Sequence, residues 1–267
     1  MLKIKPKKEV KKIVNFIKGT LEKQGFKKVI IACSGGIDST TVLFLAVRSL
    51  GAKNVLVIKL PTKNQNMNGV NNVLKNLKIT EKNVFEINIS PIIKKILSTI
   101  NYQSRRSQGS SIKPRLSTIN NLRLGNITAR TRMVILYDLA KAHQALVCGT
   151  ENKSEHFLGY FTRFGDQASD IEPIKHLYKT QIYQLSKYLK IPEKIIKKEP
   201  TAGLWQGQTD EKELGFSYKQ ADPVLYFYCE KKLAEKEILK KGLTKTKEVI
   251  KKVKQNKFKR QVPYWLF

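Results

Sequence analysis

Residues 28–39, KVIIACSGGIDS, decide the fold. The apolar and β-branched run at 29–33 predicts a short strand that is buried on both faces, as in a parallel sheet. A Ser-Gly-Gly turn ends this run, and the apolar residues at 40–47 predict a buried helix. A strand, a glycine turn and a helix N-terminus form an anion-binding site, because free backbone N–H groups and the positive end of the helix dipole point at the same spot.

Asp38 is unexpected in a bare anion site, because its carboxylate repels a phosphate. A divalent cation that bridges the carboxylate to the phosphates would explain it. The Walker A pattern needs a Lys after its glycines, and none follows here. The hexapeptide at 34–39 instead resembles the SGGxDS loop of the ATP pyrophosphatases, which cleave ATP between its α and β phosphates and hold the departing pyrophosphate in this loop. The alternative is an ordinary strand-to-helix turn that Asp38 caps.

Bulk composition narrows the class of protein. A length of 267 residues with 41% hydrophobic residues allows one large domain or two small ones. No apolar run approaches the ~18 residues that a membrane span needs, and the N-terminus lacks the features of a secretory signal. Cys33 and Cys148 end apolar runs, where buried free thiols are expected, and no Cys/His spacing indicates zinc. We therefore expect a cytoplasmic protein.

The charge is unusual: 51 basic residues stand against 21 acidic ones, a net charge of +30. Nucleic-acid binding, a polyanionic small-molecule substrate and compositional drift are three possible explanations. The lysines are spread along the chain without the interleaved aromatic residues that are typical of RNA-binding surfaces. We favour drift together with an anionic substrate, and we expect no nucleic-acid partner.

The order of predicted elements indicates the fold class. Further strands are predicted at 54–60, 83–89 and 145–148, with helices between them. This alternation of strands and helices predicts an α/β fold with a doubly wound, Rossmann-like parallel β-sheet flanked by helices, in a single domain spanning 1–267. Ligands bind beyond the carboxyl ends of such strands, where the SGGIDS loop lies. Residues 102–118 are polar, basic and without periodicity, which predicts a mobile loop.

Motifs in the second half of the chain resemble those of one family, the ammonia-dependent NAD synthetases. GNITARTRM at 125–133 is similar to the family's GNxxARxRM segment. Further family-like segments follow in order: GTENKSE at 149–155, GYFTRFGD at 159–166, DIEP at 170–173, YKT at 178–180, EPTAGL at 199–204, QTDE at 208–211 and KRQVP at 259–263. The resemblance runs from about residue 28 to residue 263, and the chain is identified as a member of this family, which has the ATP pyrophosphatase type of fold.

The resemblance implies a ligase reaction, the ATP-dependent amidation of nicotinic acid adenine dinucleotide (deamido-NAD). The nicotinate carboxylate attacks the α-phosphate of ATP, pyrophosphate leaves, and ammonia attacks the resulting carboxyl-adenylate to give NAD and AMP. Adenylation is needed because a carboxylate is a poor electrophile. Charge builds on the pyrophosphate, so the catalysis is mostly electrostatic and suits backbone N–H groups, Mg²⁺ and cationic side chains.

The same resemblance implies residue roles, position by position. ATP would be bound by Ser34, Gly35, Gly36, Ile37, Asp38, Ser39, Lys59, Gln65, Thr150, Lys179 and Thr201. Mg²⁺ would be held by Asp38 and Glu155, a pair that is sufficient when phosphate oxygens and water complete the shell. The catalytic residues would be Lys179, acting on the α-phosphate or the leaving group, and Asp166, which would orient or deprotonate ammonia. Deamido-NAD would be bound by Asn126, Arg130, Asp166, Lys259 and Arg260.

Some positions depart from the family pattern. Lys59 stands where related enzymes can carry Arg, which keeps the charge but loses bidentate phosphate binding. Gln65 matches an adenine-side glutamine when the 61–67 segment aligns without a gap. Phe258 takes the place of a histidine that often precedes the KR pair. Outside the family context, Glu155 would be read as an ordinary surface acid.

The nitrogen donor and the assembly follow from the resemblance as well. Only about 27 residues precede the first strand, too few for the amidohydrolase domain of glutamine-dependent NAD synthetases. Free ammonia is therefore the expected donor, unless a separate subunit supplies it. The family is homodimeric, and apolar faces on the predicted helix at 119–142 would suit such an interface.

Two alternatives remain at the level of sequence. One is another SGGxDS adenylating enzyme, of the tRNA-thiolating or GMP-forming type, which would not be expected to carry GNITARTRM or EPTAGL. The other is a basic nucleic-acid-binding protein with a degenerate nucleotide loop. The joint presence of Asp38, Glu155, Asp166 and Lys179 argues against the second alternative.

Overall fold

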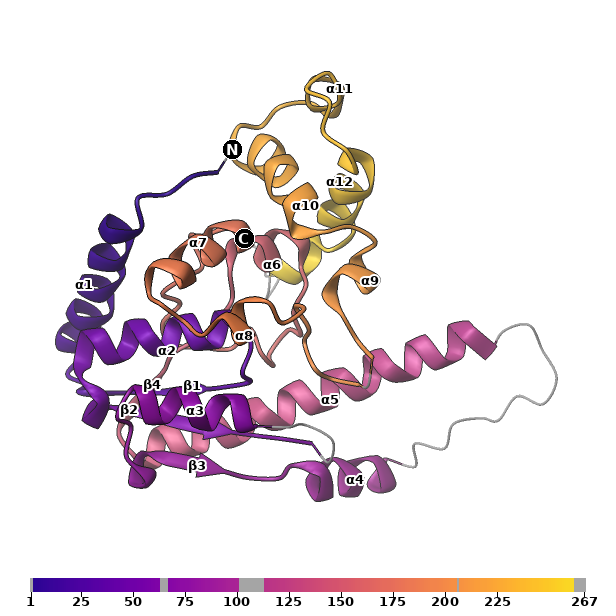
Figure 1. Cartoon of the computed structure of the whole chain (residues 1–267). Helices are drawn as coiled ribbons and strands as arrows, with labels where there is room; N and C mark the ends of the chain where they lie inside the picture. The colour runs from indigo at the N-terminus through magenta and orange to yellow at the C-terminus, as the bar shows by residue number, and fades with distance from the viewer. Residues whose placement is uncertain (1, 63–66, 101–112, 206, 262–267) are drawn as a thin grey trace, which may run out of the picture.

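A parallel sheet of four strands forms the centre of the molecule (Figure 1). The structure, a computed structural model, describes residues 2–62, 67–100, 113–205 and 207–261, without the side chains of 113–120. The strand order is β3-β2-β1-β4. The strands are β1 (Lys28–Ala32), β2 (Val55–Lys59), β3 (Val84–Glu86) and β4 (Ala145–Val147). The predicted doubly wound parallel fold is confirmed.

Both faces of the sheet are covered by helices. Successive side chains of a strand point to opposite faces, so each central strand contributes to two apolar clusters. Val29 and Ile31 lie in one apolar cluster, and Ile30 lies in another. Helices on the first side are α1 (Pro6–Gln24), α2 (Ile37–Leu50), α3 (Asn68–Asn76) and α7 (Lys179–Tyr188). Helices on the second side are α4 (Ser90–Thr99) and α5 (Lys113–Ala142). Continuous apolar runs in β1 and β2 are explained by this burial on both faces.

A third apolar cluster is formed by the C-terminal part of the chain, in orange to yellow in Figure 1. Its elements are α6 (Lys153–Leu158), α9 (Asp210–Leu214), α10 (Tyr218–Leu225), the π-helical turn η3 (Tyr226–Glu230), α11 (Glu235–Leu239) and α12 (Thr246–Gln255). The short helices η1 (Ala52–Asn54), η2 (Glu81–Asn83), α8 (Glu193–Ile196) and η4 (Lys257–Arg260) complete the described secondary structure. Leu158 belongs to this cluster, so α6 joins it to the end of β4.

The segment expected to be a loop at 102–118 differs from the prediction at its C-terminal end. Helix α5 begins at Lys113, so residues 113–118 are helical, and the preceding part of the expected loop lies outside the described residues. Helix α5 also continues through Gly125, which lies in its interior. A Cβ there would lie 2.9 Å from Leu204 Cδ1, so close packing against the 199–204 segment explains this glycine.

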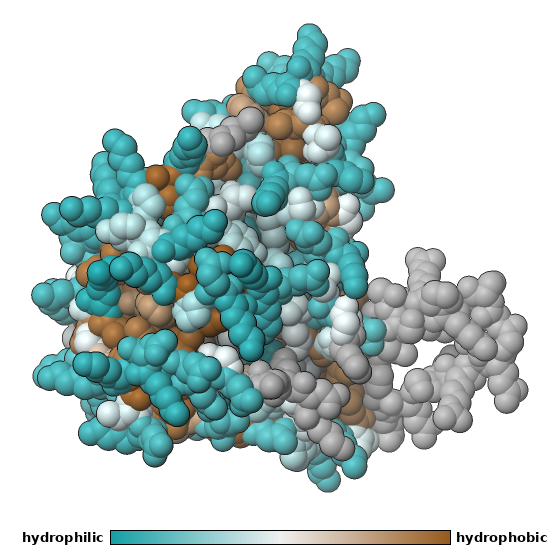
Figure 2. Space-filling view, in the orientation of Figure 1, coloured by the Kyte–Doolittle hydropathy of each residue, from teal (hydrophilic) through white to brown (hydrophobic). Residues whose placement is uncertain are grey.

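Figure 2 shows hydrophilic residues over most of the visible face, with apolar residues between them. Within the described ranges, no helix combines the length and the apolarity needed to cross a bilayer.

Candidate active site

The SGGIDS loop lies at the carboxyl edge of the sheet, as predicted. The backbone N–H of Cys33 still pairs with the Ile58 carbonyl at 2.9 Å, and α2 begins four residues later. Two hydrogen bonds within the loop stabilise its conformation. The Gly36 N–H donates to Ser34 Oγ at 3.3 Å, and Ser39 Oγ donates to the Gly36 carbonyl at 3.2 Å. The N–H groups in the first turn of α2 have no intrahelical carbonyl to bond, so this turn can bind an anion.

Gly35 has the left-handed φ of +74° that this turn requires, and a Cβ there would meet Val70 Cγ2 at 3.1 Å. We expect Gly35→Ala to lower the free energy of unfolding by about 1 kcal/mol or more and to raise the KM for ATP. Denaturant unfolding and initial-rate kinetics would measure both effects.

The matched control is Gly19→Ala, in the interior of α1, where no atom lies within 4 Å of the added Cβ. Alanine should stabilise that helix by up to about 1 kcal/mol. Equal changes of unfolding free energy in the two variants would contradict the assigned strain.

A buried lysine joins the two predicted metal ligands. Lys179 Nζ lies 2.5 Å from Asp38 Oδ2 and 3.2 Å from Glu155 Oε1. The three residues stand in the first turns of α7, α2 and α6 respectively, so three helix N-termini converge on one point. The Lys179 side chain is only 3% exposed. The structure therefore brings Asp38 together with two residues that lie more than a hundred positions further along the sequence.

Local helix capping explains how Glu155 reaches this point. Asn152 Oδ1 accepts from the Glu155 N–H at 3.0 Å, and Glu155 Oε2 accepts from the Asn152 N–H at 3.3 Å, which is a capping box. Asn152 Nδ2 also donates to Asp38 Oδ1 at 3.0 Å. Asn152 thus ties the two carboxylates together, a role that the sequence analysis missed. The Asn-x-x-Glu spacing directly after a predicted strand was the available signal.

Lys179 is positioned by a second set of residues that the sequence analysis did not assign. Its backbone N–H donates to Ser154 Oγ at 2.8 Å, and Ser154 Oγ donates to Asp222 Oδ1 at 2.6 Å. Asp222 Oδ2 accepts from both the N–H and the hydroxyl of Thr180, at 2.8 and 2.7 Å. The Lys179 ammonium also lies 5.1 Å from the centroid of the Tyr218 ring. These contacts fix the start of α7 and hence the direction of the lysine side chain.

Burial and charge act in opposite directions on this cluster. Burial raises the pKa of Glu155, and the Lys179 ammonium opposes this rise. For Lys179, burial favours the neutral amine, but the carboxylates of Asp38, Glu155 and Asp210 outweigh it and raise the pKa above its ordinary value. Lys179 is therefore an ammonium ion, suited to stabilise a phosphate oxygen and unsuited to act as a base.

The carboxylate oxygens of Asp38 and Glu155 suit a Mg²⁺ ion that a phosphate also coordinates. Carboxylate oxygens of Asp38 and Glu155 both reach one cation, the Lys179 ammonium, so they converge on a single point. Mg²⁺ prefers such oxygens and often takes only one or two carboxylates from the protein. Across the described ranges, no group of three or more His, Cys, Asp or Glu side chains is arranged to hold a metal. The site therefore suits a metal that arrives with its phosphate ligand better than an all-protein cage.

The remaining predicted ATP contacts lie in different surroundings. Thr150 follows β4 at the same edge of the sheet. Thr201 Oγ1 donates to the Gln208 carbonyl at 2.7 Å and accepts from the Gly203 N–H at 3.0 Å, so it stabilises the turn of its own segment. Buried Lys59 donates to Asn71 Oδ1 at 2.9 Å and pairs with Glu86. Gln65 lies outside the described residues.

Most of the residues predicted to bind deamido-NAD surround the segment at 159–166. Asn126 Oδ1 accepts from Thr162 Oγ1 at 2.8 Å, and Asp166 Oδ1 accepts from the Thr162 N–H at 2.9 Å. Arg130 Nε donates to the Arg163 carbonyl at 3.2 Å. Lys259 Nζ donates to the carbonyls of Gly159 and Phe161, at 2.7 and 2.8 Å.

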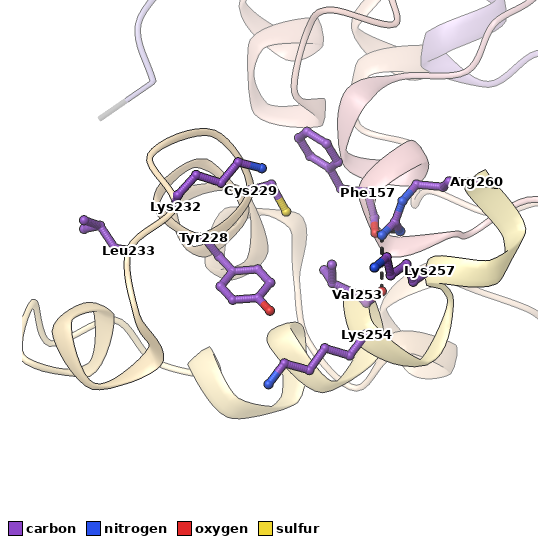
Figure 3. A pocket seen from close by; sticks show the side chains of 9 residues that line it. All are labelled: Phe157, Tyr228, Cys229, Lys232, Leu233, Val253, Lys254, Lys257 and Arg260. Atoms are coloured by element: carbon purple, nitrogen blue, oxygen red, sulfur yellow. Dashed lines mark hydrogen bonds between the residues drawn. The ribbon is translucent and has the colours of Figure 1, made fainter. Parts of the chain in front are cut away.

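Arg260 lies apart from this group. Its Nη1 donates to the Phe157 carbonyl at 2.6 Å, and its guanidinium lines a cavity between η3 and α12 (Figure 3). The predicted metal ligands thus cluster around Lys179, and most of the residues predicted to bind deamido-NAD cluster around the 159–166 segment. Lys59, Thr201 and Arg260 make their contacts outside these two clusters.

The model of the family described as NAD synthase matches residues 9–263. The chain belongs to the NAD synthase family. Among similar curated proteins, the NH(3)-dependent NAD(+) synthetase of Fusobacterium nucleatum is 40% identical over 256 residues, covering 94% of this chain and 92% of that protein. The corresponding protein of Thermococcus sibiricus is 38% identical over 260 residues, covering 96% and 95%. The family predicted from GNITARTRM and the later motifs is confirmed.

Solved structures give the same family. An NMN synthetase from Francisella tularensis has a TM-score of 0.79 and 29% identity, with 99% of each chain covered. An NH3-dependent NAD synthetase from Campylobacter jejuni, in complex with the nitrate ion, has a TM-score of 0.75 and 28% identity, with 99% of this chain and 100% of that chain covered. NAD synthases are ATP-using ligases, so neither the thiolation or GMP-forming alternative nor the nucleic-acid-binding alternative is favoured.

Proposed function

We propose that the chain amidates deamido-NAD with ammonia and ATP through a carboxyl-adenylate, releasing NAD, AMP and pyrophosphate. The observation that carries the proposal is the convergence of Asp38, Glu155 and Lys179 beside the SGGIDS loop of an NAD synthase. Two acids and a lysine at the N-termini of three helices suit a reaction in which pyrophosphate leaves.

On the phosphate side, the first-turn N–H groups of α2 and the Lys179 ammonium bind and polarise the triphosphate. Ser34 and Ser39, whose hydroxyls lie 3.3 Å apart, add donors at the mouth of the loop. Asp38 and Glu155 would hold Mg²⁺, which would neutralise phosphate charge and so favour the departure of pyrophosphate. Thr150 and Thr201 supply further contacts to ATP.

On the substrate side, Asn126, Arg130 and Lys259 gather around the 159–166 segment and place the nicotinate carboxylate for its attack on the α-phosphate. Asp166 is anchored through one carboxylate oxygen by the Thr162 N–H. Its other oxygen accepts a proton from ammonium or orients ammonia toward the adenylate. Lys59, paired with Glu86, acts on ATP indirectly by supporting the end of β2.

Free ammonia is the nitrogen donor in this proposal, and the chain acts as a homodimer in the cytoplasm. The close relatives whose lengths it nearly spans are named for ammonia dependence. Exposed apolar residues on α5, of which Val134 is 61% exposed, support a dimer interface on that helix. Three free thiols suit a reducing compartment.

A steady-state assay of the purified chain tests the proposal. With ATP, Mg²⁺, deamido-NAD and ammonium, we expect NAD, AMP and pyrophosphate in equal amounts. Because a solved NMN synthetase is among the similar structures, nicotinic acid mononucleotide is the competing substrate. A higher kcat/KM for the mononucleotide would favour that second function, and no amide product from either substrate at any ammonium concentration would refute both.

A further inference from the structure

The cavity that Arg260 lines lies in the C-terminal cluster, away from the cluster of Asp38, Glu155 and Lys179. It has a volume of about 450 Å³ and lies between η3 and α12 (Figure 3). Four basic residues line it: Lys232, Lys254, Lys257 and Arg260. The volume falls in the range of small-molecule sites.

Within the part of the chain that the structure describes, no acid balances this positive charge. None of the residues that line the cavity is Asp or Glu, and within the described residues none of the four basic residues forms an ion pair. The nearest acid in sequence, Glu230, is engaged elsewhere: its Oε1 accepts from Lys153 Nζ at 2.6 Å and from the Tyr178 hydroxyl at 3.0 Å. Uncompensated positive charge in a cavity attracts an anion and raises its local concentration.

The walls of the cavity are preorganised. Arg260 is fixed by the carbonyls of Phe157 and Val253, at 2.6 and 3.4 Å. The opposite wall is the π-helical turn η3, a rare conformation that occurs frequently at functional sites. Lys232, just after this turn, has a left-handed φ of +58°. In Figure 3 the side chains of Lys232 and Lys257 extend toward the space between the two walls.

The rest of the lining is apolar or aromatic. Val253 and Leu233 supply aliphatic surface, and Phe157 and Tyr228 supply aromatic rings. A bare inorganic anion would leave this surface unused, whereas a phosphate ester with an apolar or aromatic group would contact both parts of the cavity.

We propose that this cavity binds a small phosphorylated molecule of nucleotide size, with its phosphate at Lys232, Lys257 and Arg260 and its base or other apolar group against Tyr228. The cavity contains no residue of the Asp38, Glu155 and Lys179 cluster, and of the residues predicted to bind deamido-NAD it contains only Arg260, which the structure places apart from the others.

The reactivity of Cys229 can report whether a ligand occupies the cavity. It lines the cavity and is half-buried, whereas Cys33 and Cys148 are 3% and 2% exposed. The chain has only these three cysteines. Alkylation of Cys229 by N-ethylmaleimide, followed by peptide mass spectrometry, therefore measures whether the cavity is filled.

AMP is the probe, and adenosine is its uncharged counterpart. We expect AMP at tenfold its Kd to slow alkylation of Cys229 by about tenfold, because only the unliganded fraction reacts. Adenosine at the same concentration should leave the rate nearly unchanged. No slowing by AMP, or equal slowing by adenosine, would overturn the proposal on the native chain.

A pair of double variants separates the cavity from general charge effects. Lys232→Gln with Lys257→Gln should abolish the protection by AMP, measured as the ratio of rates without and with AMP in the same variant. Lys8→Gln with Lys11→Gln, two exposed lysines of α1, removes the same charge and should keep the protection. Protection that persists in the cavity variant, or disappears equally in the α1 variant, would also overturn the proposal.

Discussion

Replacing Asp38 by Asn should lower the rate of NAD formation by about a thousandfold, the scale expected when a preorganised electrostatic group is removed from a transition state. The substitution keeps the size of the side chain but removes the charge that faces the Lys179 ammonium and that, in the proposed reaction, would hold Mg²⁺. Because Lys179 keeps its contact to Glu155, the protein should remain folded. Initial rates and thermal unfolding, measured on the same preparation, separate the two effects.

The matched control is Glu81→Gln, the same loss of one negative charge at an exposed acid of η2. Its rate and melting temperature should equal those of the native protein. A near-normal rate for Asp38→Asn would refute the assignment of Asp38 as a metal ligand. A rate loss accompanied by loss of the folding transition would leave only a structural role for this residue.

Replacing Lys179 by Met should lower both activity and stability. Methionine fills a similar volume, but it leaves the carboxylates of Asp38 and Glu155 facing each other without a cation. Removing one partner of a buried ion pair destabilises a protein by about 3 kcal/mol. We also expect a loss of at least about a hundredfold in kcat, because the charge that faces the leaving group is gone.

Mg²⁺ distinguishes this explanation from simple loss of packing. Added Mg²⁺ should raise the melting temperature of Lys179→Met more than that of the native protein, because a divalent cation can take the place of the ammonium between the two carboxylates. Lys175→Met is the control, since Lys175 pairs with a different buried acid, Glu151, at 2.7 Å. An equal Mg²⁺ response in both variants would contradict the convergence of Asp38 and Glu155 on one cation site.

The sheet and the phosphate loop could be predicted because their signals are local. The apolar run at 29–33 followed by Ser-Gly-Gly specifies a buried strand and a tight turn within a few residues. The start of α5 was predicted too late, because the polar composition of 102–118 hid the helix-start signal of Pro114, the second residue of α5. Apolar residues in that segment show no regular spacing that would have indicated a helix.

The site could be predicted only in part, for a physical reason. Family motifs named Asp38, Glu155 and Lys179, and the fold brings these distant residues within hydrogen-bond distance. The supporting residues Asn152, Asp222 and Tyr218 act through contacts across three helices, which no local pattern encodes, apart from the capping box at Asn152. The direction of Arg260 is likewise set by tertiary packing against the end of α6.

Oxygen-18 in the nicotinate carboxylate of deamido-NAD reveals whether a carboxyl-adenylate forms. When that carboxylate attacks the α-phosphate, an O–P bond forms and the bond to pyrophosphate breaks. Ammonia then attacks the carbonyl carbon, and the bridging oxygen leaves with AMP. We expect mass spectrometry to find one labelled oxygen in AMP and none in pyrophosphate. Unlabelled AMP, or label in inorganic phosphate, would contradict a carboxyl-adenylate intermediate.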